Sequence, residues 1–267
     1  MSFDLITLEY RDTFAIITLN NPQRRNALSL QLMGELTQVL REVGESGVTG
    51  VMLAANGPVF SAGHDFADAV GRDLVEMRRL LRVCTEMMDT LQEMPQPVLA
   101  RVHGLATAAG CQLVATCDLA VASTRAGFAV PGGKGGWFCT TPMVALSRNI
   151  GRKRALEMLL TGDTIDAQTA CAWGLVNRVV EPEQLEEDAL RLLTAATRGS
   201  WISKGMGKQA FYAQIDLPQH QAYNHAIEVM ASTSQLSDAQ EGMRAFLEKR
   251  RPEFIVPHTL PWTKATR

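Results

Sequence analysis

Residues 98–123, VLARVHGLATAAGCQLVATCDLAVAS, decide the fold class expected for this chain of 267 residues. Residues 98–102 and 118–123 are short apolar runs typical of buried strands, and residues 108–116 between them predict a buried helix. A strand, a helix and a strand at this spacing require crossover connections and hence a mainly parallel sheet. The stretch therefore predicts an α/β fold.

The rest of the chain extends this pattern on both sides. Strands are predicted at residues 5–10, 14–19 and 51–55, and helices at residues 29–45, after the N-cap Ser29, and 69–93, before Pro95 and Pro97. Beyond residue 180 the pattern is nearly all helical, with helices expected at 183–196, 201–214, 218–232 and 238–250. We therefore expect an α/β core over residues 1–198 and a helical region over residues 199–267.

Composition excludes several classes of protein. The chain is 46% hydrophobic, carries a formal charge of −2 and has five cysteines, none in a C-x-x-C motif. This balance gives no general attraction to nucleic acid or an anionic membrane, and it argues against a disulfide framework or a zinc site. The sequence shows neither a basic leader nor a run of membrane-spanning length, so we expect a cytoplasmic protein that does not insert into a membrane. From the cysteine spacing we also expect no bound metal.

Two turns of small residues carry the chemistry that the sequence suggests. They are residues 60–65, FSAGHD, and residues 104–112, GLATAAGCQ, and each follows an apolar strand-like run. Turns of this kind can aim two backbone N–H groups at one point, where they would hold a carbonyl oxygen that is becoming an enolate. Gln112 stands where a carboxylate would make this an ordinary acid/base site.

Some side chains near these turns have two interpretations. His64 could be a general base, since its ordinary pKa is near neutral, or it could contribute through its backbone N–H alone. Cys139 follows the glycine-rich residues 132–136 and could be packed or reactive; a helix beginning at Thr141 and Pro142 would lower its pKa. Residues 137–138 are expected in the pocket wall.

Two basic segments also need interpretation. Arg24 and Arg25 are either a solvated pair or a contact to phosphate. Residues 205–208, GMGK, suggest a phosphate loop, but Gln209 replaces the metal-binding hydroxyl and the glycine spacing is wrong. The second segment is therefore not expected to bind a nucleotide.

Six segments in order give the chain a family resemblance. They are residues 19–29, 60–65, 110–120, 160–163, 172–176 and 241–250. In these segments the sequence resembles the enoyl-CoA hydratase/isomerase family of the crotonase superfamily. Residues 106–112 and 138–142 resemble its divergent subgroup, the enoyl-CoA hydratase domain-containing proteins.

This resemblance implies a fold, a ligand and a site. The fold would be a crotonase-like spiral of ββα units with C-terminal helices that mediate trimerisation, giving a homotrimer or a dimer of trimers. The substrate would be an acyl-CoA thioester, with coenzyme A entering as part of the substrate and no other cofactor bound. The oxyanion hole would consist of the N–H groups of His64 and Ala109. The residues implied to contact the substrate or its coenzyme A portion are Arg24, Arg25, Ala27, Leu28, Ala62, Asp65, Gly110 and Gly132.

The departures from the family pattern concern the reaction. The two glutamates of the hydratases align with Gln112 and Gly132, and a further family carboxylate aligns near Thr140. Without them efficient hydration is not expected, because general acid/base catalysis contributes about 10²–10⁴-fold. The first hypothesis is an acyl-CoA lyase, such as a decarboxylase of a malonyl-type thioester, with Gln112, Cys139 and Thr140 beside the reacting carbons. The alternatives are a non-catalytic acyl-CoA binder and a structural subunit of a mixed oligomer.

Overall fold

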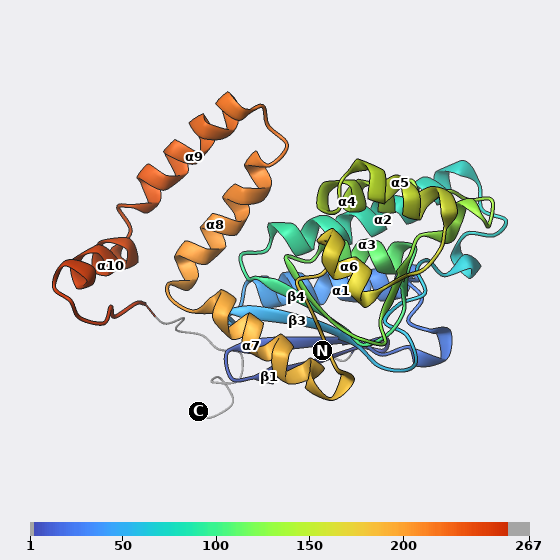
Figure 1. The fold of residues 1–267 in the computed structure, drawn as a ribbon, viewed down its shortest axis with the longest axis horizontal. Helices are drawn as coiled ribbons and strands as arrows, with labels where there is room; N and C mark the ends of the chain where they lie inside the picture. The colour runs from blue at the N-terminus through green and yellow to red at the C-terminus, as the bar shows by residue number, and fades with distance from the viewer. Residues whose placement is uncertain (1–2, 256–267) are drawn as a thin grey trace.

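A six-stranded sheet forms the centre of the molecule in the computed structural model, which describes residues 3–255 (Figure 1). Its strand order is β1-β2-β3-β4-β6-β9. These strands are β1 (Ile6–Arg11), β2 (Phe14–Leu19), β3 (Gly50–Ala55), β4 (Val98–Val102), β6 (Leu119–Ser123) and β9 (Arg178–Val180). β1 and β2 are antiparallel, and each later pair of neighbours is parallel. The mainly parallel sheet expected from residues 98–123 is therefore confirmed.

Helices cover both faces of this sheet, and the alternation of side chains along the strands decides which residues each face buries. In β2, Phe14 and Ile16 pack in a cluster with Leu193 of helix α7, whereas Ala15 and Ile17 belong to the larger cluster with helices α1, α2 and α3. The helices are α1 (Leu30–Gly44), α2 (Leu74–Glu93), α3 (Ala109–Thr116), α4 (Pro142–Asn149), α5 (Arg152–Thr161), α6 (Ala167–Trp173), α7 (Leu185–Thr197), α8 (Trp201–Gln214), α9 (Gln219–Thr233) and α10 (Ser237–Leu247).

The structure contains a second, three-stranded sheet whose strands were not predicted from the sequence. It has the order β5-β7-β8, formed by Ala106–Thr107, Gly127–Ala129 and Ile165–Asp166. Strands of two or three residues are too short to show an alternating pattern. The nearby helices α5 and α6, at the end of the core, were likewise not predicted individually.

Helix α2 begins later than the sequence suggested. The expected start was residue 69, but residues 66–68 form a 3₁₀ turn and α2 starts at Leu74. Asp73 is the N-cap, and its carboxylate accepts hydrogen bonds from the N–H groups of Val75 and Glu76. The carboxylate of Glu76 in turn accepts a hydrogen bond from the N–H of Asp73. This reciprocal capping box fixes the start of the helix.

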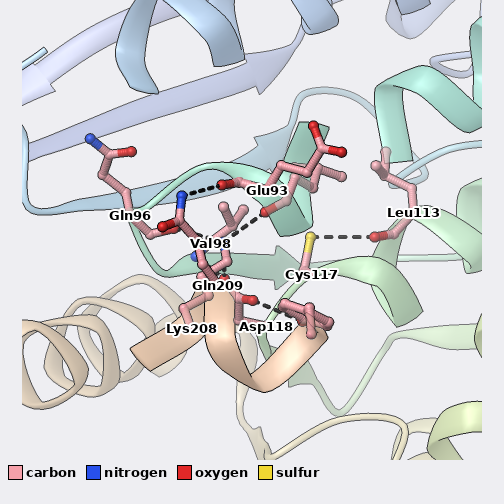
Figure 2. A network of polar contacts seen from close by, with 10 residues as sticks. Glu93, Gln96, Val98, Leu113, Cys117, Asp118, Lys208 and Gln209 are labelled. Carbon is pink, nitrogen blue, oxygen red and sulfur yellow. Dashed lines mark hydrogen bonds and ion pairs between the residues drawn. The ribbon is translucent and has the colours of Figure 1, made fainter. Parts of the chain in front are cut away.

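Helices α8, α9 and α10 extend away from the sheet as an arm (Figure 1). Gly205 of α8 lies against the turn after α2, since a Cβ on it would lie 2.8 Å from the Cβ of Pro95. One turn later, the buried ammonium of Lys208 donates to the carbonyl oxygens of Leu91 (2.7 Å) and Gln96 (2.8 Å) and pairs with Asp118 at 2.7 Å (Figure 2). Residues 205–208 therefore dock a helix, which agrees with the rejection of a phosphate loop.

The same carboxylate closes the network around α8. Asp118 also accepts hydrogen bonds from the N–H of Val98 (2.6 Å) and the hydroxyl of Tyr212 (2.8 Å). Burial raises the pKa of Asp118 and lowers the pKa of Lys208, and the attraction between the two charges opposes both shifts. The network joins the arm to the first residues of β4 and β6. No helix among residues 3–255 is both long and apolar enough to cross a membrane.

Candidate active site

One cavity of about 500 Å³ lies between the two turns of small residues and the glycine-rich segment. Its wall is largely apolar, and the residues that form this part are Phe66, Leu81, Trp137, Phe138 and Pro142. The expectation that Trp137 and Phe138 belong to a pocket wall is confirmed. Phe66 and Leu81 were missed, because an aromatic residue in a polar loop and a leucine in an amphipathic helix carry no distinguishing signal.

Two glycines let the turns approach each other. A Cβ on Gly110 would lie 2.5 Å from the carbonyl oxygen of Ser61. A Cβ on Gly63 would lie 2.9 Å from the Cβ of Ala108 and 3.1 Å from the backbone nitrogen of Ala109. Gly63 also has a φ of +82°, a conformation that glycine adopts without strain. Residues 60–65 and 104–112 therefore meet in space.

The backbone N–H of His64 points away from Leu28, the residue beside it in the neighbouring loop. Leu28 forms an isolated parallel bridge with His64, in which its N–H donates to Gly63 (2.7 Å) and its carbonyl accepts from Asp65 (3.3 Å). In such a bridge the hydrogen-bonding groups of the intervening residue face the opposite side. Within residues 3–255 the N–H of His64 donates no hydrogen bond, and His64 lines the cavity.

Ala109 supplies the second N–H at the start of α3. The first bond of this helix runs from the N–H of Gln112 to the carbonyl of Ala108, so the N–H of Ala109 has no partner among the described residues. Ala109 is buried and lines the cavity. The preceding Ala108 holds a φ of 51° and a ψ of −120°, which is strained for a residue with a Cβ. This strain was not foreseen from the sequence.

The imidazole of His64 is mostly buried beside Trp137. The ring centroids are 6.0 Å apart, and neither ring nitrogen forms a hydrogen bond of normal geometry within the described part of the chain. Burial lowers the pKa of His64, although the nearby Leu28 backbone and the charge of Asp68 act to raise it. Because the ordinary pKa is already below 7, the ring is neutral at pH 7. A neutral ring next to the cavity leaves both interpretations of His64 open.

Cys139 occupies space beside Gly132. A Cβ on Gly132 would lie 2.8 Å from the Cys139 sulfur and 2.1 Å from the carbonyl oxygen of Trp137, so position 132 has no room for a side chain. Cys139 lines the cavity, but burial raises the pKa of its thiol, and the lowering expected from a helix start at Thr141 is wrong. Thr141 also makes no capping hydrogen bond with its side chain, although α4 begins at Pro142 as expected.

The other predicted reactive positions are separated by the structure. Thr140 lines the cavity, whereas Gln112 is buried on α3 and is not part of the cavity wall. The Oε1 atom of Gln112 has no hydrogen-bond partner within residues 3–255. An unpaired buried acceptor is destabilising by about 1–3 kcal/mol, and a donor on a bound molecule would remove that penalty.

The predicted ligand-binding loop, residues 26–28, is organised around Asn26, whose structural role the sequence did not show. Its buried side chain donates to the carbonyl oxygens of Asn56 (2.8 Å), Val59 (3.1 Å) and Phe60 (3.1 Å). Asn26 itself adopts a φ of 50°. The loop that carries Ala27 and Leu28 is thereby tied to the strand end before residues 60–65.

The predicted coenzyme A contacts lie on or next to this loop. Arg24 pairs with Asp65 at 2.7 Å, so part of its charge is already compensated by a carboxylate. Arg25 is exposed, and its carbonyl accepts a hydrogen bond from the N–H of Ala62, which lines the cavity together with Gly132. The roles of these residues and of Gly110, Ala27 and Leu28 in binding remain predictions.

The polar groups of the cavity include no carboxylate. Among the described residues that line it, the titratable side chains are His64, Lys134 and Cys139. Lys134 pairs at 2.5 Å with Asp163, and both side chains are exposed. Within residues 3–255 no group of three His, Cys, Asp or Glu residues is placed to hold a metal ion.

Comparison with known proteins gives this geometry a family. The model of the family "Enoyl-CoA hydratase/isomerase" matches residues 9–256. The "Enoyl-CoA hydratase domain-containing protein 3, mitochondrial" of Rattus norvegicus is 44% identical over 252 residues, which are 93% of this chain and 83% of that protein. Its name places that protein in mitochondria, so the cytoplasmic location of this chain stays a prediction.

Two solved structures have the same fold. The enoyl-CoA hydratase of Mycobacterium smegmatis matches with a TM-score of 0.91 and 44% identity, covering 94% of this chain and 98% of that one. Human enoyl-CoA hydratase domain-containing protein 3 matches with a TM-score of 0.90 and 39% identity, covering 94% and 100%. The crotonase-like fold and the divergent subgroup are therefore confirmed. The chain belongs to the enoyl-CoA hydratase/isomerase family.

Proposed function

We propose that this chain binds an acyl-CoA thioester in the cavity and stabilises its enolate with the N–H groups of His64 and Ala109. The observation that carries the proposal is the pair of N–H groups that find no partner among residues 3–255, on two turns that Gly63 and Gly110 allow to meet beside the cavity. A donor of this kind contributes about 3 kcal/mol to the transition state in acyl-transfer enzymes. Ala109 lies at the N-terminus of α3, where the positive end of the helix dipole also favours a negatively charged oxygen.

The reaction that best suits this site is loss of carbon dioxide from a malonyl-type thioester. The bond between the α-carbon and its carboxylate breaks, carbon dioxide leaves, and the electron pair forms the enolate whose oxygen the two N–H groups hold. A proton from water then completes the acyl-CoA product. This step needs no carboxylate from the protein, and the described residues that line the cavity supply none. Lys134 would attract the substrate carboxylate before it leaves.

Cys139 and Thr140, which line the cavity, would be the polar groups nearest the reacting carbons, whereas Gln112 is buried on α3 outside the cavity wall. The unpaired Oε1 atom of Gln112 would accept a hydrogen bond only from a molecule, such as the proton-donating water, that passes beyond that wall. The hydroxyl of Thr140 and the un-ionised thiol of Cys139 would orient the acyl group rather than exchange protons at neutral pH. Neither group replaces the family's glutamates in hydration.

A second candidate function is acyl-CoA binding without turnover. Position 132 is filled by Cys139 and the carbonyl of Trp137, so the place of the second glutamate is closed and not merely empty. A structural subunit of a mixed oligomer is the remaining alternative. Large apolar side chains are exposed on the arm, as a self-associating surface would have, and they include Phe211, Tyr223, Ile227 and Met230. On this basis we also propose the homotrimer, or dimer of trimers, that the family resemblance implies.

The test is a binding titration with acetyl-CoA, crotonyl-CoA and malonyl-CoA, followed by mass analysis of each mixture. The proposal expects binding of all three and a loss of carbon dioxide from malonyl-CoA alone. Binding without any change of mass would favour the non-catalytic binder. An absence of binding would overturn the proposal and favour the structural subunit.

One substitution tests the position of Gln112. The variant Gln112→Glu should gain crotonyl-CoA hydration if this side chain reaches the β-carbon of the acyl group, and Gln112→Leu should not. A folded Gln112→Glu protein that binds crotonyl-CoA and adds no water would contradict that position.

A further inference from the structure

Three arginines form a stripe on the exposed side of α2. Arg78, Arg79 and Arg82 are all exposed, and their spacing places them within two helical turns on one side of the helix. With Val75, Val83 and Glu86 they line a shallow surface groove of about 370 Å³. No ion pair or hydrogen bond of these three guanidinium groups occurs within residues 3–255.

The acidic side chains of α2 nearest this stripe are already engaged. Glu76 pairs with Arg72 at 3.3 Å and closes the capping box. Glu86 pairs at 2.6 Å with Arg41, which comes from α1. The stripe therefore presents local positive charge on a chain whose formal net charge is −2.

An apolar surface leads from the stripe toward the cavity. Four side chains between the 3₁₀ turn and the first turn of α2 are largely exposed: Phe66 (66%), Val70 (79%), Leu74 (64%) and Val75 (70%). Phe66 also lines the cavity, as does Leu81, which lies between Arg79 and Arg82 on the same helix. Together these residues make one surface, residues 66–82, with apolar and basic parts.

We propose that residues 66–82 dock the protein on an anionic lipid surface, with Arg78, Arg79 and Arg82 on the headgroup phosphates. Protruding apolar side chains beside unpaired cations are the combination that binds peripherally at a membrane, where the apolar groups enter the headgroup boundary. An acidic protein partner would be matched by the charge but not by four separate, projecting apolar side chains. The docked orientation turns the Phe66 edge of the cavity toward the lipid. This inference goes beyond the proposed function and does not depend on it.

The test is flotation of the full chain with vesicles of phosphatidylcholine alone and with vesicles that also contain phosphatidylglycerol. We expect binding to the anionic vesicles only, weakened by salt. The triple variant Arg78→Glu, Arg79→Glu, Arg82→Glu should bind roughly tenfold more weakly or worse. The control, Arg125→Glu, Arg152→Glu, Lys153→Glu, makes the same change of charge on other exposed residues and should bind as the parent does.

Replacing apolar residues supplies a second variant. Val70→Ser with Leu74→Ser should weaken vesicle binding while leaving the salt dependence in place. Failure of the parent to bind anionic vesicles, or equal losses in the control, would overturn the proposal. A changed oligomer mass in the α2 variant without a vesicle effect would also overturn it and assign this face to a second copy of the chain.

Binding of soluble crotonyl-CoA by the same proteins separates this inference from the proposed function. An α2 variant that keeps its crotonyl-CoA affinity and loses vesicle binding supports the lipid surface. A parent protein that binds vesicles but no acyl-CoA supports the lipid surface and refutes the proposed function.

Discussion

Two glycine-containing segments of this chain make close contacts between distant parts of the sequence, with opposite results. Residues 205–208 bring α8 against Pro95, and residues 60–65 meet residues 104–112 beside the cavity. In the first contact the buried cation is satisfied: the ammonium of Lys208 donates to the backbone carbonyls of Leu91 and Gln96 and pairs with Asp118. In the second, the backbone N–H groups of His64 and Ala109 have no partner in the described part of the chain.

This difference shows how to tell a structural glycine motif from a functional one. Lys208 is a buried cation that offers three donors, and the carbonyl and carboxylate oxygens around it use them. His64 and Ala109 hold donors that the described protein leaves free and that face a cavity. A satisfied network holds a fold together, whereas unsatisfied donors at a cavity are available to a ligand.

The largest expected effect breaks the satisfied contact. Lys208→Met leaves the carboxylate of Asp118 buried without its cation and removes the donor to two carbonyl groups. The free energy of unfolding should fall by about 3–5 kcal/mol, measured by urea denaturation. Lys204→Met, on an exposed residue one turn earlier, should change it by less than about 0.5 kcal/mol. Similar losses for the two variants would contradict the structural role of the network.

The next effect concerns the contact beside the cavity. Gly110→Ala places a methyl group 2.5 Å from the Ser61 carbonyl oxygen, so the two turns must separate. We expect a loss of about 1–3 kcal/mol in unfolding free energy. Crotonyl-CoA affinity should fall by roughly tenfold or more, because the two N–H groups move apart.

Gly34→Ala is the matched control for Gly110→Ala. Gly34 is also helical, and a Cβ on it would meet no atom within 4 Å. The variant should gain up to about 1 kcal/mol and bind as the parent does. Unchanged binding in Gly110→Ala would show that the distance between the turns does not matter.

A smaller effect in the opposite direction sharpens the comparison. Ala108→Gly relieves a positive φ immediately before the Ala109 donor and should stabilise the protein by about 1 kcal/mol. Thermal unfolding measures the gain. Ala213→Gly, on an exposed residue of α8, should instead lose about 1 kcal/mol. A destabilised Ala108→Gly protein would mean that the backbone at residue 108 is not strained.

The smallest effect compares two thiols, one in each region. Burial raises the pKa of Cys139, so its thiolate fraction at pH 7 is below that of an ordinary thiol and increases as the pH rises. Labelling by iodoacetamide should therefore keep accelerating above about pH 9, where an ordinary thiol is already mostly ionised. Cys117 is also buried, but it is not part of the cavity wall and its thiol donates a hydrogen bond to the Leu113 carbonyl, so it should label only after unfolding. Equal labelling rates, read by peptide mass analysis, would contradict this difference.

The sequence predicted the elements with strong patterns. Strands β1, β2, β3, β4 and β6, helix α1, and α8 from residue 201 to residue 214 follow from apolar runs, the Ser29 cap and helical spacing, whereas the three-residue strand β9 was not predicted. The start of α2 was placed too early because the 3₁₀ turn before it was read as part of the helix. The Asp73 capping box marks where the helix begins. The two- and three-residue strands of the second sheet carry too little sequence to form a pattern.

The sequence predicted that the two turns meet and that Trp137 and Phe138 line the pocket, but not how each side chain is buried and paired. Small residues at positions 63 and 110 indicated a close approach of two turns, and the structure places those turns together. The pKa of Cys139 was predicted in the wrong direction, because the burial of a side chain depends on tertiary packing that local spacing does not give. The contacts of Asn26 were not foreseen for the same reason: its three carbonyl partners lie 30 or more residues away along the chain.

The packing around Gly132 has a consequence for the history of the site. A family member that lost a glutamate by a single substitution could regain it by a single substitution. Here a side chain at residue 132 would collide with the carbonyl of Trp137 and the sulfur of Cys139. A glutamate at this position would therefore need coordinated changes in the surrounding loop, and a single substitution would not supply it.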